Sequence, residues 1–235
     1  MKKTLWIAIA GALAASVIAA SAQEVLSANA VGYIKKTLPP AGGLVMMSIP
    51  LDSMTDTNIV FGRSSVAQEA AQNSTVFFWN EVTQIWSIGS KGTKGWQPAQ
   101  SNQVVAAGQA FFLKSPTNAA APADVTITGE VPPTIGQPVI SRSVVGQGNL
   151  SPLANPYPVD FKFGESQLAS GAAQGSTVFF WNSVGQSWSI GSKGTKGWQP
   201  AQSNQIVAAG DGFFLKSSNA TSFVWTEPVA PYTWP

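Results

Sequence analysis

Residues 74–115 read STVFFWNEVTQIWSIGSKGTKGWQPAQSNQVVAAGQAFFLKS, and residues 176–217 read STVFFWNSVGQSWSIGSKGTKGWQPAQSNQIVAAGDGFFLKS, 102 residues further on. Only six of the 42 positions differ: 81, 83, 85, 104, 109 and 110. A period this long indicates two tandem copies of one unit, because solenoids repeat every 20–50 residues. The same spacing pairs residues 59–62 with 161–164 and, more loosely, Pro50 and Leu51 with Pro152 and Leu153. The duplication therefore extends toward the start of each copy.

The repeated stretch has the composition of β-strands. Residues 75–80 are β-branched and aromatic, residues 84–88 alternate, and residues 110–114 follow the turn residue Gly108. Further strands are expected at residues 30–37, 43–49, 125–128, 139–145, 149–153 and 223–226. Helical patterns are confined to residues 65–71 and 167–173. The chain is thus predicted to be all-β, with two tandem β-sandwich-like domains.

A difference between the copies predicts which face of one strand is buried. Ile85 becomes Ser187, whereas Trp86 and Ile88 recur as Trp188 and Ile190. An apolar residue exchanges cheaply with a polar one where water reaches it. We therefore expect Ile85 to be exposed and the alternating Trp86 and Ile88 to point inward.

The first 22 residues have the pattern of a bacterial signal peptide. Lys2 and Lys3 precede an uncharged run at residues 5–20, and Ala20-Ser21-Ala22 fits a cleavage site. The alternative, a membrane anchor, needs about 20 apolar residues. We expect cleavage after Ala22 and export to the periplasm, the cell surface or the medium, without membrane insertion.

The mature chain is expected to divide into two domains. The first copy is predicted to span residues 23–131 and the second residues 139–235. Residues 132–138 contain three prolines, which favour an extended, stiff linker.

A family resemblance rests on three short motifs. Asn155-Pro156-Tyr157-Pro158, residues 177–182 and residues 209–216 resemble the β-rich modules that precede type IX secretion sorting domains. Residues 25–33, together with the duplication, resemble a group of uncharacterised secreted two-copy β-rich proteins of diderm bacteria. The resemblance implies a β fold and export. The sequence departs from the first group at its end, since no sorting domain is recognised before Pro235, and we therefore do not expect export by the type IX route.

Composition excludes several classes of chemistry. The chain has no Cys and no His, so disulfides, thiol nucleophiles, cysteine-bound zinc and a histidine base are excluded. It has 13 basic and 11 acidic side chains, and the excess of two equals Lys2 and Lys3 of the predicted signal peptide. A neutral mature chain gives no reason to expect nucleic acid as a partner. We expect no metal and no cofactor.

Paired carboxylates are the one common catalytic device that this composition leaves. At a spacing of 102, the acidic residues at 52, 56, 69, 81 and 124 fall on Ala154, Pro158, Gly171, Ser183 and Thr226. The copies share no carboxylate, so we expect no catalytic residue and no enzyme activity. A glycosidase with one active copy is the reading that this comparison leaves open.

The glycine-rich loops at residues 89–95 and 191–197 are the weak candidates for ligand binding. A phosphate loop is excluded because Lys94 stands where the Walker pattern needs glycine. One interpretation is a plain connection between strands. The other is an exposed site for acidic polysaccharide or for a neighbouring subunit, formed in the two copies by Trp96, Lys91, Lys94, Trp198, Lys193 and Lys196.

Two functions follow as expectations. The first is an exported, non-catalytic β protein with a structural, assembly or adhesion role, self-associating through edge strands, with residues 24–31 donated to a neighbour. The second is a carbohydrate-binding module that uses the loop Trp and Lys residues of both copies.

Overall fold

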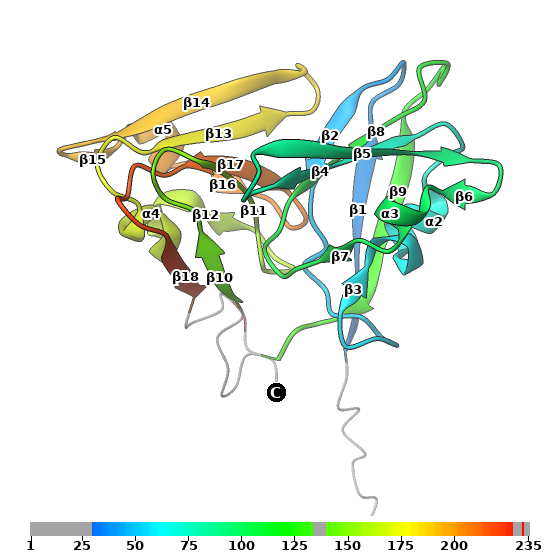
Figure 1. Cartoon of the computed structure of the whole chain (residues 1–235), viewed down its shortest axis with the longest axis horizontal. Coiled ribbons are helices and arrows are strands. Elements are labelled where there is room, and N and C mark those ends of the chain that lie inside the picture. Colours follow the sequence, from blue (N-terminus) through cyan, green and yellow to red (C-terminus); the bar gives the residue numbers. More distant parts are fainter. Residues whose placement is uncertain (1–29, 134–139, 228–231, 233–235) are drawn as a thin grey trace, which may run out of the picture.

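The computed structural model describes residues 30–133, 140–227 and 232, which form six β-sheets and a few short helices (Figure 1). The predicted all-β fold is confirmed. The predicted signal peptide, residues 24–29 of the donated segment and most of the predicted linker lie outside the described residues. We call residues 30–133 the first half and residues 140–227 the second half.

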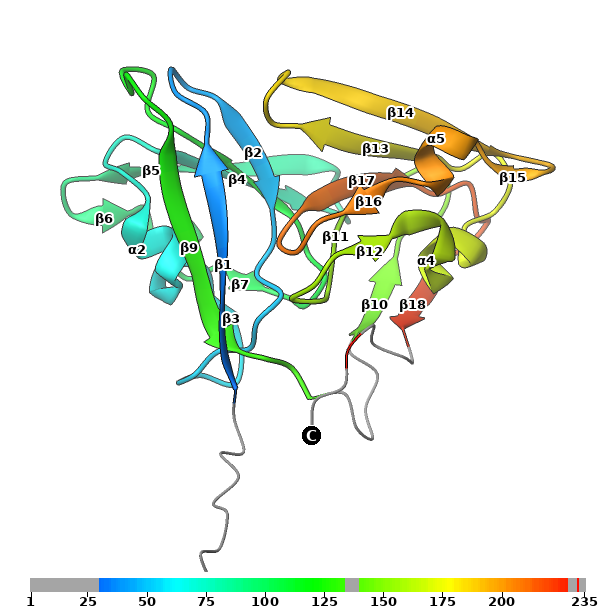
Figure 2. The ribbon, with the colours of Figure 1, turned by 180° about the vertical axis from the view of Figure 1, so that it is seen from behind.

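The first half contains three sheets, with strand orders β1-β9, β2-β8-β4-β5-β6 and β3-β7. Figure 2 shows the long β1–β9 ribbon in front of the five-stranded sheet, with α2 beside β9. Its elements are β1 (Val31–Leu38), β2 (Leu44–Met47), β3 (Ile59–Val60), η1 (Phe61–Arg63), α2 (Ser65–Glu69), β4 (Thr75–Asn80), β5 (Ile85–Gly92), β6 (Gly95–Trp96), α3 (Pro98–Ser101), β7 (Val104–Val105), β8 (Phe111–Lys114) and β9 (Ala123–Glu130).

The second half repeats this arrangement, with strand orders β10-β18, β11-β17-β13-β14-β15 and β12-β16. Its elements are β10 (Ile140–Val144), β11 (Leu150–Ala154), β12 (Phe161–Lys162), η2 (Phe163–Glu165), α4 (Gln167–Gly171), β13 (Thr177–Asn182), β14 (Ser187–Gly194), β15 (Gly197–Trp198), α5 (Pro200–Ser203), β16 (Ile206–Val207), β17 (Gly212–Lys216) and β18 (Phe223–Glu227).

The register corrects the way the two copies align before β3. Leu44 lies opposite Lys114, and Leu150 lies opposite Lys216. The lysines are 102 residues apart but the leucines are 106 apart, so the first half has 106 − 102 = 4 extra residues between β2 and β3. The expected pairing of Pro50 and Leu51 with Pro152 and Leu153 is wrong, because this insertion shifts it by four residues.

The expected orientation of Trp86 and Ile88 is also wrong. Phe78 points into the core of its own half, so its neighbours Phe77 and Trp79 point to the opposite face of the sheet. The register places Ile88 beside Phe77 and Trp86 beside Trp79 on that opposite face. Ile85 is exposed, as expected. The exchange of Ile85 for Ser187 did not identify the face that packs in the core of the half, because both faces of this sheet carry aromatic residues.

The outer faces of the two five-stranded sheets pack against each other in an inter-half core. This core consists of Met46, Ala110, Phe112, Ala154 and Phe214, with Phe77, Trp79, Phe179 and Trp181 packed against it. Figure 1 shows the sheets meeting in the middle of the molecule, where β11 and β17 lie beside β2 and β4.

Reciprocal hydrogen bonds give this interface a pseudo-twofold symmetry. The indole Nε1 of Trp79 donates to the carbonyl of Leu150 at 3.1 Å, and that of Trp181 donates to the carbonyl of Leu44 at 2.9 Å. The side-chain amide of Gln84 bonds both backbone groups of Leu150, and the equivalent Gln186 does the same to Leu44. Each half thus supplies the same side chains to the other.

Backbone bonds follow the same symmetry. The Ser48 N–H donates to the carbonyl of Gly210, and the Ala154 N–H donates to that of Gly108, both at 2.9 Å. Gly108 and Gly210 are equivalent positions, and a Cβ on either would meet the other half, at Ile140 and at Lys36 respectively. The two halves therefore approach to backbone contact.

Two ion pairs cross the interface from equivalent basic positions. Lys36 Nζ lies 2.5 Å from Asp211 Oδ1, and Arg142 pairs with Glu81. The Lys36 and Arg142 side chains are only 12% and 11% exposed. Burial raises the pKa of Glu81 above its ordinary value, although the positive charge of Arg142 opposes this shift.

Replacing Phe214 by alanine is expected to destabilise the whole chain. Its ring is buried in the inter-half core and contacts Trp79 and Trp86 of the first half. The loss should be about 3–5 kcal/mol in the free energy of unfolding, measured by urea denaturation. Phe223→Ala, at a half-buried ring within the second half, is the control. A loss for Phe214→Ala no greater than for this control would contradict the account of the interface.

Candidate binding surfaces

Lys91 and Lys193, two of the residues singled out from the sequence, hold helices. Lys91 Nζ donates to the carbonyls of Ala67, Gln68 and Ala70 at 2.7–2.9 Å, at the C-terminal end of α2. Lys193 Nζ makes the equivalent three bonds at α4. Burial lowers the pKa of both lysines from the ordinary value of 10.5. A cation at this end of a helix is favourable, because the last carbonyls lack partners within the helix.

Trp96 and Trp198 pack against the cores of their own halves. The indole Nε1 of Trp96 donates to the Ala67 carbonyl at 2.8 Å. Its ring packs edge-to-face with that of Phe61, with the two ring centroids 5.1 Å apart. Trp198 makes the same contacts with Ala169 and Phe163. Both indoles are half-buried, so only part of each ring faces water.

Lys94 and Lys196 are exposed at the tips of the β5–β6 and β14–β15 hairpins. The structure thus separates the predicted site residues into two groups. Lys91 and Trp96 both bond the carbonyl of Ala67 and fasten α2 to the sheet, whereas Lys94 projects from the turn. The equivalent residues of the second half divide in the same way.

Lys91→Met should lower the free energy of unfolding by about 1–2 kcal/mol, because three carbonyls of α2 lose a charged donor. The measurement is urea denaturation at neutral pH. Lys94→Met is the matched control and should change stability by less than about 0.5 kcal/mol, as exposed substitutions usually do. Equal losses in the two variants would contradict the helix-holding role of Lys91.

An exposed aromatic surface lies beside the inter-half core. We call it the aromatic face and define it as Trp86, Ile88, Trp188 and Ile190 flanking Phe112 and Phe214. The two indoles are each 38% exposed, and the isoleucines are 52% and 53% exposed. Both indoles contact both phenyl rings, with centroids 5.9–6.0 Å apart. The halves therefore contribute equally to one continuous apolar surface.

Sequence reasoning missed the aromatic face, although a signal for it was present. The run Phe77-Phe78-Trp79 puts aromatic rings on both faces of β4, and β5 continues both rows. One face fills the core of the half, so the other must find a partner or face water. The outward-facing rings of β4, Phe77 and Trp79, pack against the second half. Trp86 and Ile88 of β5 continue this row at the exposed margin.

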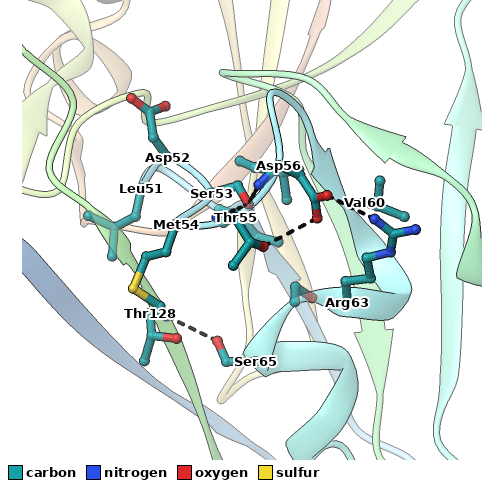
Figure 3. A pocket seen from close by; sticks show the side chains of 13 residues that line it. Leu51, Asp52, Ser53, Met54, Thr55, Asp56, Val60, Arg63, Ser65 and Thr128 are labelled. Carbon is teal, nitrogen blue, oxygen red and sulfur yellow. Dashed lines mark hydrogen bonds and ion pairs between the residues drawn. The ribbon is translucent and has the colours of Figure 1, made fainter.

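A cavity of about 200 Å³ lies in the first half, at the loop that contains the four extra residues. Figure 3 shows Asp56 turned toward Arg63, with which it forms an ion pair at 2.8 Å, while Asp52 points to the other side of the loop. The Ser53 Oγ accepts the backbone N–H of Asp56 at 3.0 Å and so orders the loop. The two carboxylates do not converge on one point in the cavity.

The pKa of Asp52 is raised from its ordinary value of 3.8, by partial removal from water and then by the negative charge of Glu130. Asp52 and Glu130 are also joined by backbone hydrogen bonds, which hold the loop against the end of β9. Within the described ranges, no group of three or more acidic side chains is placed to hold a metal ion.

Asp52→Asn should stabilise the chain at pH 7. A raised pKa in the folded state means that ionisation of Asp52 opposes folding. The protonated carboxyl of Asp52 stabilises the folded state. This contribution is complete below the ordinary pKa of 3.8 and is lost as the pH rises through the raised pKa of the folded state. The variant stays neutral, so its advantage in urea denaturation should shrink and vanish on acidification below pH 3.8. A variant less stable than the parent at pH 7 would contradict this sign.

No helix among the described residues is both long and apolar enough to span a membrane. Comparison with protein-family models, with curated proteins and with solved structures finds no match to this chain.

Proposed function

We propose that the protein is an exported, non-catalytic β protein that acts by assembly, with a structural or adhesive role at the cell surface or in the periplasm. The observation that carries this proposal is the aromatic face, where the exposed indoles of Trp86 and Trp188, one from each half, both contact Phe112 and Phe214. Ile88 and Ile190 are exposed two residues further along the same strands. Monomeric proteins rarely leave such side chains contiguous unless a partner covers them.

The carboxylates support a non-catalytic role, because eight of the ten in the described residues form ion pairs or accept backbone N–H groups. Five form ion pairs with lysine or arginine, namely Asp56, Glu81, Asp124, Glu165 and Asp211. Glu69, Asp160 and Glu227 accept backbone N–H groups. A general acid and base would need two carboxyl groups that converge on a substrate.

The partner that we propose for the aromatic face is a second copy of this chain. The face is continuous with the inter-half core, where the same residue types already recognise one another across a pseudo-twofold. A chain without its predicted signal peptide has equal numbers of basic and acidic side chains, so two copies do not repel each other through net charge. Export rests on the signal-peptide pattern and on the resemblance to secreted two-copy proteins.

Ile88→Ser with Ile190→Ser should abolish or strongly weaken self-association of residues 23–235. Each isoleucine should contribute about 1.5 kcal/mol or more when covered, which is roughly tenfold in affinity. Sedimentation and light scattering over a concentration series measure the effect, and electron microscopy distinguishes closed dimers from filaments.

Ile85→Ser is the matched control, because it makes the same substitution in the same strand on the opposite face, where the second half already has Ser187. It should leave association unchanged. A parent chain that remains monomeric at high concentration, or equal effects of the two substitutions, would refute the assembly proposal.

Carbohydrate binding is a second candidate, favoured by the exposed Lys94 and Lys196 in identical hairpins beside partly exposed indoles. A glycan array tests it. Binding that falls in Lys94→Ala with Lys196→Ala, but not in the Ile88 and Ile190 variant, would support it. No binding to any glycan would exclude it.

A further inference from the structure

One close contact between the halves lies at one of the six positions that differ between the copies. Ala110 is fully buried, and its equivalent in the second half is Gly212. A Cβ built on Gly212 would lie 2.5 Å from the Cβ of Ala110 and 3.1 Å from the Cγ of Met46. Cβ atoms do not approach within 3.0 Å, so this contact has room for one methyl group but not for two.

The pseudo-twofold makes this contact selective. Because residues 110 and 212 occupy equivalent positions, the symmetry places them opposite each other. Two first halves packed in this way would oppose alanine to alanine and collide. Two second halves would oppose glycine to glycine and leave a gap. The combination of one first half and one second half fills the space with a single methyl group.

The interface charges do not discriminate between these combinations. Lys36 lies in a cavity with Ser183 and Asp211, and Arg142 lies in a cavity with Glu81 and Gln109. Each basic residue thus meets one carboxylate, at position 211 in one case and at position 81 in the other. Two first halves packed together would also give each basic residue one carboxylate, because Lys36 of each copy would meet Glu81 of the other. Selectivity must therefore come from shape.

We propose that Ala110 and Gly212 are the specificity-determining pair of the inter-half interface. Through them the surface built on β2 and β8 accepts a second half as its partner and rejects another first half. The proposal goes beyond the assembly function, since it concerns the buried contact between halves and not the aromatic face. It also gives a structural reason for the difference between Ala110 and Gly212 in two otherwise similar copies.

Gly212→Ala in the full chain tests the proposal. The added methyl should force the halves apart, lower the urea midpoint and reduce the folding equilibrium constant about tenfold or more, as overpacking does. The indole N–H resonances of Trp79 and Trp181 should shift, because both indoles bond carbonyls across the interface. Gly194→Ala is the matched control in the same half, since the nearest atom to its Cβ would be the Gly197 carbonyl oxygen at 3.8 Å.

The exchange variant Ala110→Gly with Gly212→Ala separates shape from general damage. It returns one methyl group to the contact, with Met46 yielding by a few tenths of an ångström. It should restore the urea midpoint and both indole resonances to near those of the parent. The proposal is overturned if Gly212→Ala behaves like Gly194→Ala, or if Ala110→Gly fails to rescue it. Neither result bears on self-association through Ile88 and Ile190.

Discussion

The packing of Phe112 and Phe214 between two facing sheets is the contact on which the rest of the molecule depends. Around these rings, Trp79 and Trp181 each reach a backbone carbonyl of the opposite half, and the indoles of Trp86 and Trp188 line the margin. Each sheet is apolar on both faces, so a half without its partner would leave a row of aromatic rings in water. The aromatic residues on the outer face of each sheet therefore need a second sheet to cover them, just as those on the inner face need the core of their own half.

The near-identity of the copies follows from this arrangement. A pseudo-twofold interface uses the same side chains from both sides, so the aromatic residues, the glutamines and the close-packed glycines at 108 and 210 serve both halves at once. Some of the differences between the copies break this symmetry. Position 81 carries the acid in one half and position 211 in the other, and both meet an equivalent basic residue.

Much of the fold could be predicted from the sequence, because strand composition and the repeat are local signals. Residues 75–80, 110–114 and 65–71 form a strand, a strand and a helix close to the expected limits. The candidate site could not be predicted in the same way. Lys91 and Trp96 look like surface residues of a glycine-rich loop, but α2, more than 20 residues earlier, supplies their acceptors. The outward direction of Trp86 depends on a second sheet that no local pattern reveals.

In the pseudo-twofold contact, each half covers most of its outer aromatic row with the other half. Adding one more unit to the chain would upset this pairing. A chain with three units would contain one whose aromatic row had nothing to pack against, and such a product would be prone to aggregate. The architecture itself thus selects for an even number of units, and two is the smallest number that satisfies it.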